Sequence, residues 1–157
     1  MDADRPPRLG DPQMSMLIAP DMSLEVAETL LAGVKKEAEN RGVRLAVAVV
    51  DRGGNPVASA RMDDAQLGAA SVALDKAVTA VSFRHPTRAW AESSAPGGSD
   101  WGLAGTLGGR AIVFPGGVPV FWRGELVGAV GVSGAASEVD EQCAEGAITS
   151  AGLGSAP

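Results

Sequence analysis

The first third of the chain carries one helical pattern followed by two strand patterns. Ser23 is a favourable N-cap, and the apolar positions after it recur at helical spacing until Gly42, where the helix should end. This apolar stripe consists of Leu24, Ala27, Leu31, Val34 and Ala38. Residues 43–50 then form an apolar, β-branched run, and the turn residues 51–55 lead into 56–61. We expect a helix followed by a β-hairpin.

The middle third predicts a second, longer helix and then a loop. Residues 64–83 are Ala-rich with apolar positions at helical spacing, and Asp63 or Asp64 is a suitable cap for their start. Pro86 disfavours helical geometry at His85, so the helix should stop there. Residues 93–110 contain Trp101 and many glycines, a composition that predicts a mobile loop without regular structure.

The last third alternates short apolar runs with turn residues. The expected elements are strands at 111–114, 118–122 and 126–132 and a closing helix over 138–151. The order α-β-β-α-β-β-β-α has hairpin-length links, which favour an antiparallel sheet of about five strands with flanking helices. The fold class is therefore α+β, with a single domain over 21–157 behind a flexible N-terminal arm, residues 1–20, that could pack on a neighbouring subunit.

The amino-acid composition limits which metal sites and catalytic groups the chain can form. The 157 residues suffice for one domain, and they include one His, one Cys and no Tyr. Zinc sites use three or four protein ligands, mostly His and Cys, so no metal site is expected. Cys143 lies on the closing helix among small apolar residues and is interpreted as a core residue. Imidazole chemistry would have to pass through His85.

The net charge of the chain limits which binding partners are expected. Lys and Arg total 13 against 19 Asp and Glu, a formal net charge of -6. Such a chain has no general attraction to nucleic acid phosphates or anionic lipid, so nucleic acid is not an expected partner. No stretch has the roughly 18–20 apolar residues of a membrane span, and the first 20 residues do not resemble a secretion signal. We expect a cytoplasmic protein that does not bind membranes.

Several short motifs occur along the chain in a characteristic order. They are AVVDRGGN at 48–55, ARMD at 60–63, KAVTA at 76–80, GGVPV at 116–120 and VGAVGVSG at 127–134, followed by Asp140. In this order the sequence resembles the GlcG/HbpS family of haem-binding or haem-degrading domains, which also occurs at the C-terminus of PduO-type proteins. The resemblance covers residues 22 to 152. It implies a small α+β domain with an antiparallel sheet, self-association and haem as a cofactor.

The residues around the end of the second helix are the candidate binding site. The resemblance implies a ligand contact at Thr87, and His85 beside it could ligate haem iron. Arg61 and Arg88, with Arg84, could hold propionates or another carboxylate, because guanidinium binds carboxylates through two hydrogen bonds. Trp101 could stack on a planar ligand. The alternative for each is structural: a capping His, surface-paired arginines and a packed Trp.

An enzymatic alternative uses the same histidine. Here His85 moves a proton, Glu92 and Asp100 supply a carboxylate, and the glycine-rich loop closes as a lid. The substrate would be a small oxo-acid, quinone or polyketide-like metabolite, handled without a cofactor by a lyase, isomerase or other proton-transfer reaction. The main hypothesis is a homo-oligomer that binds haem or a similar planar molecule, with haem degradation or redox sensing as its function.

Overall fold

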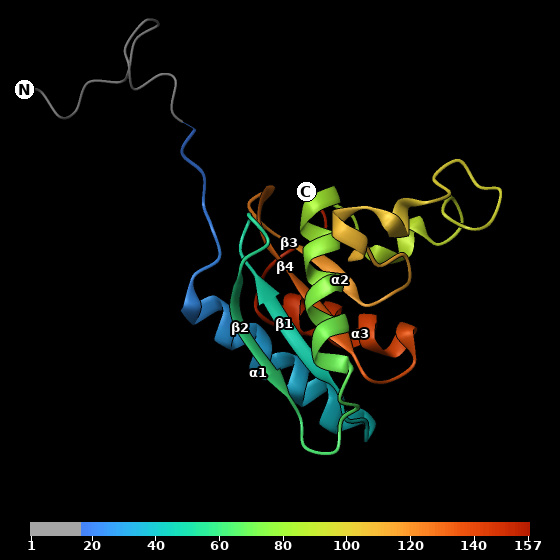
Figure 1. The fold of residues 1–157 in the computed structure, drawn as a ribbon. Coiled ribbons are helices and arrows are strands. Elements are labelled where there is room, and N and C mark those ends of the chain that lie inside the picture. The colour runs from blue at the N-terminus through green and yellow to red at the C-terminus, as the bar shows by residue number, and fades with distance from the viewer. Residues whose placement is uncertain (1–16) are drawn as a thin grey trace, which may run out of the picture.

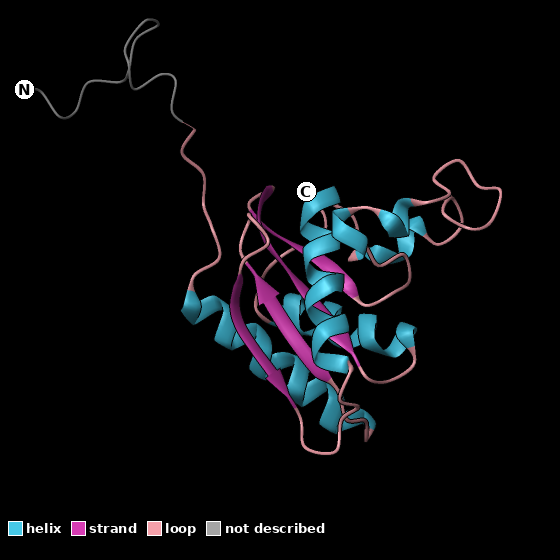
Figure 2. Ribbon diagram, in the orientation of Figure 1, coloured by secondary structure: helices cyan, strands magenta, loops and turns pink. Residues whose placement is uncertain are grey.

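The computed structural model describes residues 17–157, which form one four-stranded antiparallel sheet between two helical layers (Figure 1). The helices are α1 (Leu24–Arg41), α2 (Ala69–Phe83) and α3 (Ser137–Ser150), and the strands are β1 (Ala46–Val50), β2 (Pro56–Arg61), β3 (Gly117–Trp122) and β4 (Glu125–Ser133). The strand order is β2-β1-β4-β3. Helix α2 covers one face of the sheet, and α1 and α3 pack together on the other (Figure 2). This architecture confirms the predicted α+β class.

Helix α1 forms as the pattern predicted. The Ser23 hydroxyl accepts a hydrogen bond from the Val26 amide at 3.2 Å, and Gly42 ends the helix with a left-handed φ of 67°. Leu30 is fully buried, whereas Leu24 is exposed. The buried face is therefore rotated slightly from the predicted stripe, because α1 packs on both α3 and the sheet.

Strand β1 is buried along its whole length because helices cover both faces of the sheet. Val47 and Val49 pack in the core beneath α1 and α3, whereas Ala46 and Ala48 lie toward α2. The turn before β2 is built on Asp51, whose carboxylate accepts hydrogen bonds from the Gly53 and Asn55 amides at 2.9 Å. The predicted hairpin is confirmed.

Helix α2 begins five residues later than predicted. Asp64 has a left-handed φ of 65° and cannot start a helix, and the N-cap position is Gly68 rather than an aspartate. The predicted end is accurate: α2 stops at Phe83, with Arg84 at a φ of 58°. Residues 62–68 therefore form a turn at the end of β2, and this turn borders a hollow described below.

The expected strand at 111–114 is wrong, so the sheet has four strands rather than five. This segment runs along α2 instead, where the Ile112 amide donates to the Thr79 hydroxyl at 3.0 Å. Residues 93–110 are more regular than predicted, since they contain short 3-10 turns at Leu103–Gly105 and Leu107–Gly109, and a further 3-10 turn precedes them at Thr87–Trp90. These turns form a lobe that projects beyond the C-terminal end of α2 (Figure 1).

The two sheet edges differ. The outer edge of β3 is covered by the C-terminal segment, where Phe121 and Gly154 exchange hydrogen bonds of 2.8 and 2.9 Å. Within residues 17–157 no strand pairs with the outer edge of β2. The part of the predicted N-terminal arm before residue 17 lies outside the described residues, and no helix from residue 17 onward is long and apolar enough to cross a bilayer.

Glycines set the distance between α2 and the sheet. A Cβ on Gly131 of β4 would lie 1.9 Å from the Ala73 carbonyl oxygen and 2.6 Å from the Ala77 nitrogen. Both contacts are with helix backbone, which cannot move aside as a flexible side chain can. Glycine at this position therefore permits the close contact between α2 and β4.

We predict that Gly131→Ala destabilises the protein by about 3 kcal/mol or prevents folding, because the added methyl pushes α2 away from the sheet. Gly68→Ala is the matched control, since a Cβ there meets nothing within 4 Å and φ is not positive. Urea unfolding followed by circular dichroism measures both. Equal stability of the two variants would contradict the prediction.

Candidate functional site

A buried ion pair lies where α2, α3 and β4 meet. The Lys76 ammonium is 1% exposed and donates to Asp140 Oδ2 at 3.0 Å and to the Val132 carbonyl at 2.8 Å. Its third side faces the Phe114 ring, whose centroid is 5.1 Å away. Burial lowers the pKa of Lys76, and the Asp140 carboxylate offsets this in part. Because the ammonium is fully surrounded, its role is to join three elements and not to bind a ligand.

Thr87 belongs to the same buried region. Its side chain has no exposed surface, and its hydroxyl accepts a hydrogen bond from the Gly117 amide at 3.0 Å. A Cβ on Gly117 would lie 2.6 Å from Thr87 Cγ2 and 2.3 Å from the Lys76 carbonyl oxygen. Thr87 therefore fixes the start of β3 against α2. In this chain conformation no ligand can reach the hydroxyl that the family resemblance suggested as a contact.

Arg88 is half-exposed and is occupied by two carboxylates of α3. Its Nη1 lies 2.8 Å from Glu141 Oε1 and donates to Glu145 Oε1 at 3.1 Å. Glu141 is almost completely buried, and this burial raises the pKa of its carboxyl group, an effect that Arg88 only partly offsets. The remaining N–H groups of Arg88 are its only free donors for an added anion.

His85 is exposed at the base of the projecting lobe. Its ring packs edge-on against Trp90 at a centroid distance of 5.8 Å, and Trp90 packs in the same way against Phe83 at 5.4 Å. The left-handed turn at Arg84 carries the chain out of α2 and presents His85 to solvent. The imidazole is thus held from one side by an aromatic ring and is open on the other.

The acid–base group of the enzymatic hypothesis is not assembled. Glu92 is exposed, and the Asp100 carboxylate accepts a hydrogen bond from the Ser99 hydroxyl at 3.4 Å. Neither carboxylate forms an ion pair with His85 within the part of the chain that the structure describes. Trp101, next to Asp100, is 66% exposed. The lobe therefore presents an imidazole and an indole to solvent without a carboxylate partner for the imidazole.

Arg61 lies far from the other predicted binding residues. It is the last residue of β2, and its Nη1 donates to the Ala65 carbonyl at 3.1 Å, before α2 begins. His85 and Arg88 follow the other end of this 15-residue helix, which is about 22 Å long. The expectation that Arg61 and Arg88 bind the same ligand is therefore wrong within a single chain, because α2 separates them.

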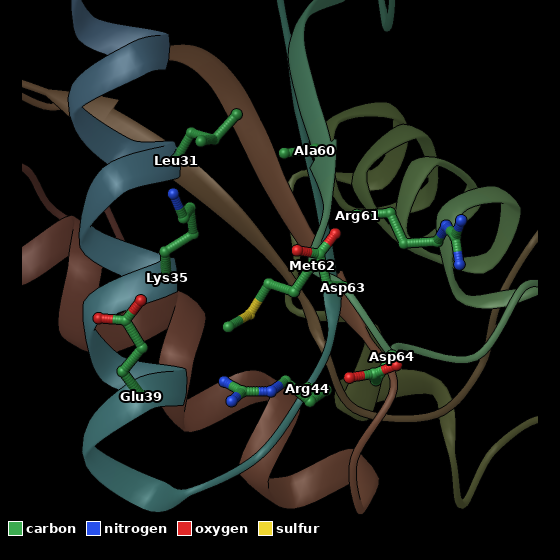
Figure 3. Close-up of a pocket in the computed structure, with 9 residues that line it drawn as sticks. All are labelled: Leu31, Lys35, Glu39, Arg44, Ala60, Arg61, Met62, Asp63 and Asp64. Carbon is green, nitrogen blue, oxygen red and sulfur yellow. The ribbon is translucent and has the colours of Figure 1, made fainter.

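Sequence reasoning missed a large hollow between α1 and β2, which we call the α1–β2 hollow (Figure 3). Its volume is about 550 Å³. Its lining residues are Leu31, Lys35, Glu39, Arg44, Ala60, Arg61, Met62, Asp63 and Asp64. One signal for it was present in the sequence: residues 31, 35 and 39 are four apart and so share one helix face. Only the tertiary structure places the turn after β2 opposite that face.

Two further hollows are smaller and less charged. One, of about 340 Å³, lies on the α2 side of β1 and β2 around Ser59 and Leu74. The other, of about 250 Å³, is lined mainly by apolar side chains that include Met22, Trp122 and Leu153. None of these three hollows contains His85 or Arg88. No group of three or more His, Cys, Asp or Glu in residues 17–157 is placed to hold a metal ion.

These features define the class of protein: a single-sheet α+β domain with a buried ion pair where α2, α3 and β4 meet and a charged hollow beside the edge strand β2. The family model described as "Haem degrading protein HbpS-like" matches residues 22–149. The chain belongs to this family, which confirms the resemblance found in the sequence motifs.

Comparisons with individual proteins agree with this family assignment. A 15.0 kDa protein from the dhaT-dhaS intergenic region of Citrobacter freundii is 38% identical over 127 residues, which are 81% of this chain and 89% of that protein. The corrinoid adenosyltransferase PduO of the same organism is 34% identical over 131 residues, but this chain spans only 39% of it. Among solved structures, the PduOC complex with haem has a TM-score of 0.83 and 30% identity, covering 87% of this chain and 99% of that one.

We predict that Lys76→Met destabilises the fold by about 3–5 kcal/mol, because it leaves the Asp140 carboxylate buried without its partner charge. Adding Asp140→Asn should recover part of this loss, since the amide keeps an acceptor for the Ala135 amide. Asp75→Asn, which breaks the more exposed Arg110–Asp75 pair, is the control and should cost less than about 1 kcal/mol. Denaturant unfolding measures all three, and a loss for Lys76→Met no larger than the control's would contradict the assignment.

Glu141 gives a pH prediction. Because burial raises its pKa above the ordinary value of 4.5, the folded state keeps this proton at pH values where the unfolded state has lost it. Its contribution to stability is fully present below pH 4.5 and is lost as the pH rises through the raised pKa. Glu141→Gln cannot ionise, so its unfolding free energy should decline less between pH 4.5 and neutrality than that of the wild type.

The matched control is Glu145→Gln, which removes the more exposed carboxylate of the same arginine. Urea unfolding at a series of pH values gives the slope for each variant. A wild-type slope in Glu141→Gln would show that this carboxyl is not the group responsible.

Proposed function

We propose that this protein binds haem or a similar planar small molecule. The observation that carries the proposal is the likeness to the PduOC–haem complex, which extends over nearly the whole of that structure at a TM-score of 0.83. The family description, which names haem degradation, supports the same ligand class. A fold match of this kind supports the ligand class more strongly than it supports any one residue, so the residues are argued from this chain's own geometry.

His85 is the proposed iron ligand. It is the only histidine of the chain, its ring is exposed, and Trp90 holds it from one side. A neutral imidazole nitrogen is a suitable axial ligand for haem iron, so the donor fits the group. Arg88 can offer a propionate only the N–H groups that Glu141 and Glu145 leave free.

The apolar surface that a porphyrin needs is present in the same part of the fold. Trp101 and Leu107 are exposed large apolar side chains of the lobe at whose base His85 lies. Burial of exposed apolar surface is the main driving force for binding a planar aromatic ligand. Thr87 contributes indirectly, by fixing Gly117 and with it the start of β3.

A second copy of the chain would complete the site. A ligand on the exposed side of His85 would be covered on one side only, whereas binding sites usually bury most of the ligand surface. Arg61, too far away in its own chain, could contribute from a neighbouring one. One histidine per chain also means that two imidazoles on one iron would require two chains. The proposed assembly is therefore a homo-oligomer that shares haem between subunits.

Haem degradation or redox sensing is the finer part of the proposal. His85 would hold the group, and bound haem would supply the redox chemistry that either function needs. Incubating the haem complex with ascorbate in air distinguishes these functions. Progressive loss of the Soret band supports degradation, whereas a reversible change in the band supports sensing.

We predict that haemin added to the purified protein gives a shifted Soret band and that His85→Ala weakens or abolishes the shift. Met62→Leu is the matched control, because it removes the methionine that faces the α1–β2 hollow and leaves His85 intact. A wild-type protein without a Soret shift would refute haem binding. A normal shift in His85→Ala together with its loss in Met62→Leu would place the iron in the hollow instead.

A further inference from the structure

The α1–β2 hollow has two walls from different parts of the chain. Leu31, Lys35 and Glu39 are successive members of one face of α1. The opposite wall is the end of β2 and the turn after it, from Ala60 to Asp64. In Figure 3 the Met62 side chain extends from this wall into the space between them, and Arg44 borders the space below.

The turn that carries the acidic residues is fixed by its backbone. The Met62 amide donates to the Leu45 carbonyl at 3.0 Å, and the Ala65 amide donates to the Met62 carbonyl at 3.2 Å. Between these two hydrogen bonds Asp64 adopts a φ of 65°, a conformation that Asp tolerates better than most residues. Asp63 and Asp64 are thus held opposite α1 by hydrogen bonds of the main chain.

Six of the nine lining residues are charged, three basic and three acidic. Within residues 17–157, none of the six takes part in an ion pair. Arg61 points away from the hollow toward α2, which leaves Lys35 and Arg44 as its cations (Figure 3). Both cations extend from the α1 and β1 side, where Glu39 is the single carboxylate, so this wall has a net positive charge, whereas Asp63 and Asp64 come from the turn.

The size and chemistry of the hollow select one class of ligand. Its volume of about 550 Å³ suits a small molecule. Porphyrin sites need predominantly apolar walls, and only Leu31, Ala60 and Met62 of the lining are apolar. A molecule with one charge would meet attraction on one wall and repulsion on the other. A molecule with both charges, separated by a short aliphatic spacer, satisfies both walls and lays its spacer on Leu31 and Met62.

We propose that the α1–β2 hollow binds a small amphoteric molecule, an amino acid with separated charges. Lys35 and Arg44 hold its carboxylate, and Asp63 and Asp64 hold its ammonium group. This site does not include His85, so it does not depend on the proposed haem site. The protein would then have a second ligand, recognised by charge and not by aromatic stacking.

Isothermal titration calorimetry at low ionic strength tests this with 4-aminobutanoate, butanoate and butylamine as probes. The wild type should bind 4-aminobutanoate more tightly than either single-charge analogue, and added salt should weaken binding. Arg44→Gln and Asp64→Asn should each weaken 4-aminobutanoate binding about tenfold, the effect of losing one charged hydrogen bond. Butanoate binding should respond only to Arg44→Gln, and butylamine binding only to Asp64→Asn.

Arg52→Gln is the matched control, because it makes the same charge change on an exposed residue at the opposite end of β1. It should bind as the wild type does, and so should His85→Ala. No heat from 4-aminobutanoate at millimolar concentrations, or equal weakening by Arg52→Gln and Arg44→Gln, would overturn the proposal. Tighter binding of butanoate or butylamine than of 4-aminobutanoate would overturn the amphoteric assignment.

Discussion

The buried Lys76–Asp140 ion pair is the interaction on which the rest of the structure depends. One ammonium group in α2 contacts a carboxylate of α3, a carbonyl of β4 and the ring of Phe114. Each contact belongs to a different part of the chain, and loss of the Lys76–Asp140 pair would leave a charge buried without its partner. This requirement fixes α2 against the sheet and α3 against the end of β4. Because the ion pair fixes α2, it also sets the place where the lobe that carries His85 leaves the end of this helix.

Several of the motifs that identify the family meet around this ion pair. Lys76 begins one motif, Gly116 and Gly117 begin another, and Asp140 follows the last of them. A Cβ on Gly116 would lie 2.5 Å from the Lys76 ammonium nitrogen, and its φ of 126° also favours glycine. These residues are required because a charged group must be buried and fully contacted at a crowded junction. Family membership is therefore strong evidence for the architecture and weaker evidence for the ligand residues, since His85 lies outside these motifs and only residues 60–63 of them line the α1–β2 hollow.

The two candidate sites lie at opposite ends of α2 and differ in chemistry. Beyond its C-terminal end, the lobe presents an imidazole and exposed apolar side chains, which suit the proposed planar ligand. Near its N-terminal end, the turn after β2 presents carboxylates to a charged hollow beside the edge strand β2. The rigid helix separates the two sites, so a ligand at one has no direct contact with the other.

The sequence by itself determined the α+β class, α1 and its caps, the β1–β2 hairpin and the core position of Cys143. These features follow from local periodicity and turn chemistry, which act over a few residues. It also identified His85 as the only imidazole, but not its exposure beside Trp90. Only the tertiary structure decided that Thr87 is buried, that Arg61 and Arg88 lie at opposite ends of α2, and that residues 111–114 lie outside the sheet. The charged hollow could not be predicted from the sequence either, because it forms only when α1 packs beside the turn after β2. Packing sets the distances between segments that are far apart in sequence.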